Sequence, residues 1–197
     1  MSNGNSPSAP SCSFRLELSG GFLLLLSLTG FLCGTQALLA AALAAAVHEL
    51  GHLALILDQG SIPGSLRLDA SGASLRCLGP VPTVRQELIR ALAGPAAGLG
   101  MWALLRGSAS AFLRISAGMS LMLSLVNLLP APGLDGGRVL DCLMTGAAKA
   151  DRWLRLAPWL GFLSALLTLL LGICRSPQLF LYGIWLFLRQ VKARLRN

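Results

Sequence analysis

Residues 35–57 form an apolar run that is long enough to cross a lipid bilayer and still contains three ionisable side chains. A transmembrane helix needs about 20 mostly apolar residues at about 1.5 Å per residue. This run reads TQALLAAALAAAVHELGHLALIL, with His48, Glu49 and His52 inside it. Ionisable groups at membrane depth are costly and usually have a function. The run therefore predicts a membrane helix that carries a functional site.

Five further apolar runs predict a polytopic membrane protein. They cover residues 18–33, 88–105, 111–129, 157–174 and 178–189. The chain is 54% hydrophobic and only 12% charged, which is too little charge for the surface of a soluble domain of this size. We expect an all-α membrane protein with about six transmembrane helices. Residues 1–13 are expected to be a disordered tail, 14–190 the membrane-embedded domain with its core at about 35–145, and 191–197 a basic cytoplasmic tail.

Residues 65–79 interrupt this helical pattern between the second and third spans. Leucine alternates with charged residues on both sides of a Ser71-Gly72 turn, which predicts a small β-hairpin. One interpretation is an ordinary surface hairpin. The other is an edge strand near the site that could pair with an extended substrate.

The net charge of +8 does not indicate nucleic-acid binding, because most basic residues flank the apolar runs as membrane anchors do. With a cytoplasmic N-terminus, eleven basic residues fall on the cytoplasmic side and three outside. The eleven are Arg15, Arg67, Arg76, Arg85, Lys149, Arg152, Arg155, Arg189, Lys192, Arg194 and Arg196, and the three are Arg106, Arg114 and Arg175. This positive-inside bias predicts that both termini are cytoplasmic.

His48, Glu49 and His52 form an HExxH motif. Histidines at i and i+4 project from one face of a helix, where both can bind Zn²⁺, while the carboxylate between them can take a proton from an attacking water. They are the only two histidines in the chain. The alternative, a polar cluster that joins helices, explains neither the spacing nor the third ionisable group.

A catalytic zinc usually has three protein ligands, so an acidic residue must supply the third. Asp58 lies at the membrane boundary about 120° around the helix from His52. The other acidic candidates fall in polar loops or, for Asp141, on a different helix face. Asp135 remains, in the stretch NLLPAPGLDGGRVL, where prolines and glycines break an apolar segment and predict a cavity. The alternative for Asp135 is a capping residue in a turn.

HELGH and NLLPAPGLDGG, with AGPAAGLG at 93–100 between them, resemble the site-2 protease family of intramembrane zinc metalloproteases. The short chain looks most similar to the stage IV sporulation protease branch. The resemblance implies zinc bound by His48, His52 and Asp135, with Glu49 as the catalytic base. It also implies that Asn127, Pro130 and Pro132 help to place the substrate.

The resemblance further implies what such a chain acts on and where. We expect hydrolysis of a peptide bond in or near a transmembrane segment of a membrane-associated substrate, which would activate a transcription or sigma factor, in a bacterial cell membrane. Membrane regulatory or inhibitory proteins are expected partners. The rival is a non-enzyme, either an inactive relative that binds membrane helices or a metal-binding transporter. For Gly94, Pro95 and Gly98 we favour close helix packing, and Asn127 could simply form an interhelical hydrogen bond.

Overall fold

A computed structural model of the chain describes residues 15–69, 72–131, 133–144 and 159–163, together with Leu166, Gly183, Ile184, Phe187 and Val191. The elements follow in the order β1 (Arg15–Leu18), α1 (Gly20–Cys33), α2 (Thr35–Asp58), β2 (Ile62–Asp69), β3 (Gly72–Leu78), α3 (Val84–Leu105), α4 (Ala111–Asn127) and α5 (Asp135–Met144). The fold is mostly helical, with a small sheet.

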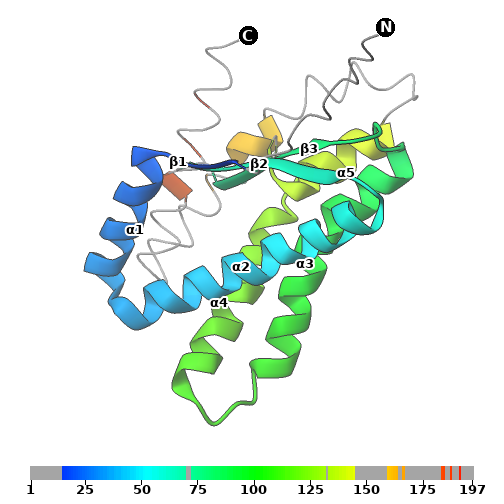
Figure 1. The fold of residues 1–197 in the computed structure, drawn as a ribbon. Helices are drawn as coiled ribbons and strands as arrows, with labels where there is room; N and C mark the ends of the chain where they lie inside the picture. The colour runs from blue at the N-terminus through cyan, green and yellow to red at the C-terminus, as the bar shows by residue number, and fades with distance from the viewer. Residues whose placement is uncertain are drawn as a thin grey trace, which may run out of the picture.

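The helices pack together and the sheet lies across one end of them (Figure 1). The chain runs away from the sheet along α1, reverses at Gly34 and returns along α2. Gly34 has a φ of 81°, in the left-handed region that glycine adopts without steric cost. Helices α3 and α4 form a second hairpin that again leaves and regains the sheet end. The end of α2, the start of α3 and the start of α5 therefore meet beside the sheet.

Within the part of the chain that the structure describes, two helical segments are long and apolar enough to cross a membrane, Gly30–Asp58 and Val84–Leu105. Only 11% and 28% of their most apolar windows are buried inside the protein. The core helix of a soluble protein would be mostly buried, so these apolar faces need another environment. Helix α4 is a shorter apolar helix.

The sheet has three strands in the order β1-β2-β3. Strands β2 and β3 are antiparallel and lie between α2 and α3, where the sequence predicts a hairpin. Strand β1 pairs parallel to β2, with Leu16 opposite Leu66. The sequence did not predict β1, because four residues carry too short an alternation and their partner is about 50 residues away in the chain. The fold is mostly helical with a small sheet, and β1 is the strand that the predicted hairpin did not include.

The first four predicted spans correspond to helices α1 to α4. The run 18–33 begins as a helix only at Gly20, since Leu18 belongs to β1. The runs 35–57, 88–105 and 111–129 correspond to α2, α3 and α4. The runs 157–174 and 178–189 lie mostly outside the described residues, as do the predicted tails, so the number of six helices stays a prediction.

Small residues allow α2, α3 and α4 to approach closely. A Cβ added to Gly51 in α2 would lie 2.6 Å from the carbonyl oxygen of Ala93 in α3. A Cβ added to Gly98 in α3 would overlap the hydroxyl of Ser124 in α4. Membrane helices associate through such small residues because lipid gives no hydrophobic force between them. This packing supports the expectation for Gly98 and sets the positions of the polar side chains on α2.

Candidate metal centre

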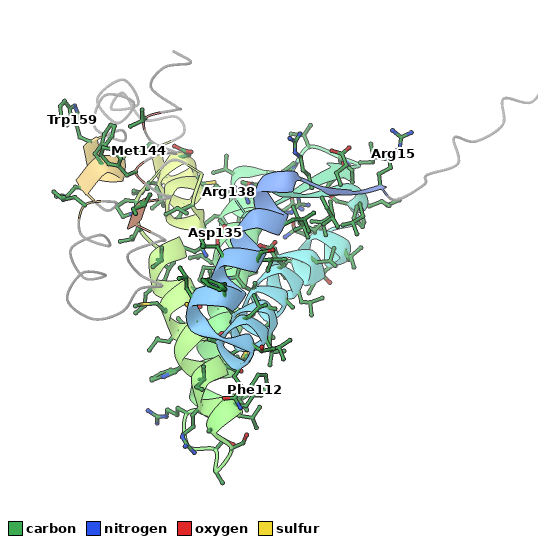
Figure 2. All side chains as sticks on the ribbon, turned by 90° about the vertical axis from the view of Figure 1, so that its left-hand side faces the viewer. Arg15, Phe112, Asp135, Arg138, Met144 and Trp159 are labelled. Carbon is green, nitrogen blue, oxygen red and sulfur yellow. The ribbon has the colours of Figure 1, made fainter. Side chains whose placement is uncertain are left out.

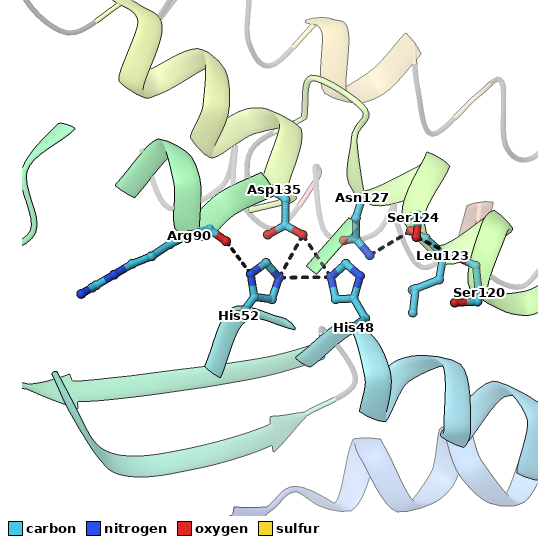
Figure 3. A network of polar contacts seen from close by, with 8 residues as sticks. All are labelled: His48, His52, Arg90, Ser120, Leu123, Ser124, Asn127 and Asp135. Carbon is cyan, nitrogen blue, oxygen red and sulfur yellow. Dashed lines mark hydrogen bonds and ion pairs between the residues drawn. The ribbon is translucent and has the colours of Figure 1, made fainter. Parts of the chain in front are cut away.

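Three side chains from two elements converge beside the sheet: His48 and His52 from α2 and Asp135 from the first turn of α5 (Figure 3). The Nε2 atoms of His48 and His52 lie 3.1 Å and 3.2 Å from Oδ2 of Asp135. The two Nε2 atoms are 3.2 Å apart. His48 and Asp135 are both buried, with 4% and 7% of their surface exposed. The structure therefore brings together the three residues for which the sequence predicts metal binding.

The donor set and its spacing fit a zinc ion. Two imidazoles and a carboxylate are ligands that catalytic zinc commonly takes. Ligand atoms at about 2.0–2.1 Å from a tetrahedral zinc lie about 3.3–3.4 Å from one another, close to the triangle of 3.1, 3.2 and 3.2 Å found here. Among the described residues, these three form a group that could hold a metal ion.

A backbone contact orients His52. Its Nδ1 lies 2.8 Å from the carbonyl oxygen of Arg90, which can only accept a hydrogen bond. Nδ1 must therefore carry the proton, and Nε2 presents a lone pair toward Asp135 and His48. Nδ1 of His48 is buried and has no hydrogen-bond partner within the described part of the chain. Arg90 could not be predicted from the sequence, because its contribution is a main-chain carbonyl that any residue supplies.

A tight approach of α5 to the end of α4 places Asp135. Figure 2 shows Asp135 at the start of α5, with Arg138 in the same first turn. Before it, Gly133 has a φ of 82°, which a proline ring cannot adopt. After it, a Cβ on Gly136 would overlap the carbonyl of Leu128. These two glycines allow the broken segment to turn Asp135 inward at the level of α2.

Gly94 of α3 borders the metal centre, which the sequence did not predict. A Cβ added there would overlap Nε2 of His52 and lie 2.8 Å from Nε2 of His48. The expectation of simple helix packing therefore holds for Gly98 but is incomplete for Gly94, whose missing side chain leaves room for the ligand atoms. A sequence signal did exist, because the AGP stretch lies between the two motifs that carry the chemistry.

We expect Gly94→Ala to weaken zinc binding about tenfold or more, because the methyl group would displace the histidine ligand atoms. Overpacking a tight site typically costs about 1–3 kcal/mol. Zinc affinity, measured by competition with a chromophoric chelator, checks this. Gly100→Ala is the matched control, since a Cβ at Gly100 meets nothing within 4 Å and the change in helix propensity is the same. Equal affinities of the two variants would contradict the role of Gly94.

The other predicted site residues are Glu49, Asn127, Pro130 and Pro132. Glu49 lies in α2 beside His48, half-buried and within electrostatic range of His48, His52 and Asp135. Asn127 ends α4, and its side-chain amide donates to the carbonyl of Leu123 at 3.0 Å. That bond lies within its own helix. Pro130 is partly exposed in the loop before α5, and Pro132 lies outside the described residues.

The chain is similar to known proteins in part of its sequence and in its fold. Residues 82–171 match the family model described as Peptidase family M50, a segment that includes Asp135 but neither histidine. No curated protein sequence matches the chain significantly. Among solved structures, the site-2 protease from Methanocaldococcus jannaschii is similar, with a TM-score of 0.67, 21% sequence identity, and coverage of 91% of this chain and 90% of that chain. In fold the chain is thus similar to a site-2 protease, and its residues 82–171 match Peptidase family M50.

Proposed function

We propose that this protein is an intramembrane zinc metalloprotease of the site-2 type. The observation that carries the proposal is the triangle of His48, His52 and Asp135, whose ligand atoms lie 3.1–3.2 Å apart next to Glu49. The match of residues 82–171 to Peptidase family M50 supports the same activity. Membership of that family, like the activity, is part of this proposal.

The residues divide the chemistry between them. Bound zinc supplies Lewis-acid polarisation of a peptide carbonyl and makes water a stronger nucleophile near neutral pH. His48, His52 and Asp135 would hold the ion through three donor atoms. Glu49 accepts the proton of the attacking water and returns it to the leaving amine. The Arg90 carbonyl keeps His52 in the tautomer that binds metal.

The substrate we propose is a membrane-associated protein cut in or near a transmembrane segment. The apolar windows of Gly30–Asp58 and Val84–Leu105 are mostly unburied, which supports a position in the bilayer. At about 1.5 Å per residue, His52 lies about 26 Å from the start of α2 and about 9 Å from its end. The site therefore lies toward the sheet end of the helices, and a substrate would reach it from that end.

Zinc-dependent hydrolysis of membrane proteins is the test of the proposed protease function. We expect membranes containing the protein to release new fragments from single-span membrane proteins, and a zinc chelator should abolish the release. The fragments are identified by comparing membrane proteomes with and without expression of the chain, and added zinc should restore them after chelation. Fragments that form equally with chelator present would exclude a zinc protease.

The same preparation tests the orientation that we propose, with the sheet end and both termini cytoplasmic. Arg15, Arg67 and Arg85 lie at the sheet end, while Arg106 and Arg114 flank the α3–α4 loop, as the positive-inside rule favours. In a cysteine-free background, Val81→Cys near the sheet should react with membrane-impermeant reagent only from the cytoplasm, and Ala109→Cys only from outside. The reverse labelling pattern would mean that the orientation is opposite to the one proposed. The cleavage site in the substrate should map toward the side of the membrane on which the sheet lies.

A further inference from the structure

Arg90 contacts α2 at two places, through its backbone and through its side chain. Its carbonyl oxygen accepts a hydrogen bond from Nδ1 of His52 at 2.8 Å. Its Nε donates to Oε1 of Gln59 at 2.6 Å, and its terminal nitrogen donates to the hydroxyl of Ser61 at 2.9 Å. One residue of α3 is thereby bonded to His52 in the C-terminal part of α2, to the C-cap of α2 and to the residue before β2.

The segment that Arg90 holds is itself well ordered by hydrogen bonds. The N–H of Ser61 donates to Ile56 and the N–H of Gly60 to Leu57, with Gly60 at a φ of 74°. This is a Schellman ending, in which a left-handed glycine closes the last helical turn. Gln59 and Ser61 stand on either side of that glycine. Their side chains are therefore fixed relative to α2, and so is the guanidinium that they bind.

The energetics indicate a specific role for the Arg90 side chain. Only 9% of the residue is exposed, and a buried guanidinium is costly unless its N–H groups are satisfied. The partners that it contacts, Gln59 and Ser61, are both neutral. The negative end of the α2 dipole lies at the same place and favours a cation there. An arginine that served only to carry surface charge would not be buried against the end of this helix.

From this geometry we infer that Arg90 is a positioning residue that couples the α2–β2 junction to the metal ligand His52. The guanidinium sets the position of α3 against the end of α2, and this sets where the Arg90 carbonyl meets the imidazole. A displacement of β2 would therefore change the orientation of His52. The inference rests on the proposed zinc site, but not on any substrate being cleaved.

Zinc affinity and the spectrum of the cobalt-substituted protein test this coupling. Removing a partner that orients a metal ligand typically costs about 10–100-fold in metal affinity. We expect Arg90→Gln to lose affinity in this range and to shift the cobalt d–d absorption bands, since these report ligand geometry. Arg85→Gln, an exposed arginine on the same helix, should match the parent protein. Arg90→Lys, which can reach one partner as a point charge, should lie between them.

A second variant separates positioning from folding. Gln59→Ala with Ser61→Ala leaves Arg90 and its carbonyl in place but removes both partners of the guanidinium. This double variant should lose as much zinc affinity as Arg90→Gln. The triple variant should lose no more than either, because all three substitutions break the same connection. Should Arg90→Gln fail to fold, the Gln59/Ser61 double variant decides alone.

The outcomes distinguish this inference from the proposed function. Parental zinc affinity and an unchanged cobalt spectrum in the folded Arg90→Gln and Gln59/Ser61 variants would overturn the coupling and leave the protease proposal intact. If these variants bind metal more weakly than the parent chain, and the parent chain cleaves no membrane protein, the result would support the coupling and count against the protease proposal. A parent chain that binds neither zinc nor cobalt would overturn both.

Discussion

Replacing Glu49 by Gln is expected to abolish most hydrolysis while leaving zinc bound. The change keeps the size of the side chain and removes its ability to accept a proton. Loss of a general base typically lowers turnover about 10²–10⁴-fold. His48, His52 and Asp135 keep their donor atoms, so zinc content should remain one ion per chain. The measurement is the rate of fragment release together with metal analysis of the same purified variant.

Glu17→Gln is the control for the removal of a carboxylate, since Glu17 lies in β1 and is exposed. It should cleave at the parental rate. Parental turnover in Glu49→Gln would mean that the proposed hydrolytic mechanism is wrong, even if zinc is present. Loss of zinc from that variant would instead indicate that Glu49 is a ligand and that the assignment of roles needs changing.

Asp135→Ala is expected to lose both zinc and activity. The substitution removes the carboxylate oxygen that lies 3.1 Å and 3.2 Å from the two histidine nitrogens. Two histidines four residues apart then remain, and affinity should fall by more than about 100-fold, beyond the usual effect of losing an outer partner. Zinc content and chelator competition measure this, and the melting temperature with and without zinc shows whether the ion still stabilises the fold.

Two aspartates provide matched controls for Asp135. Asp141 lies on the same helix, α5, and is exposed, while Asp58 is exposed at the end of α2. Alanine at either position should leave zinc affinity and turnover unchanged. A zinc-loaded and active Asp135→Ala variant would remove Asp135 from the ligand set and reopen the search for the third ligand.

The helical part of the site could be predicted because its pattern is local. HExxH lies on one helix, so the spacing of the letters determines which face the two histidines share. Asp135 is 87 residues from His48, and sequence reasoning reached it by excluding other acids and by resemblance. The structure now places its carboxylate between both imidazoles. Its functional role stays a prediction until the variants are measured.

Other features could not be predicted, for two physical reasons. The carbonyl of Arg90 is a backbone group, which leaves no pattern of residue types in the sequence. Strand β1 depends on parallel pairing with β2, and a long-range pairing of four residues is invisible to periodicity. The backbone contact of Arg90 and the pairing of β1 with β2 form only once α2, α3 and the sheet have packed together.

The serines between α3 and α4 have a consequence for the electrical properties of the membrane. Ser116, Ser120 and Ser124 are each less than 2% exposed. Their hydroxyls donate to the carbonyls of Phe112, Gly98 and Ser120 respectively. Each of these three hydroxyl protons is thus used, and a Cβ added to Gly98 would overlap the hydroxyl of Ser124, so the two helices are closely packed there. We therefore expect a bilayer that contains the protein to keep its electrical resistance, because these hydrogen-bonded helix faces offer ions no polar path between α3 and α4.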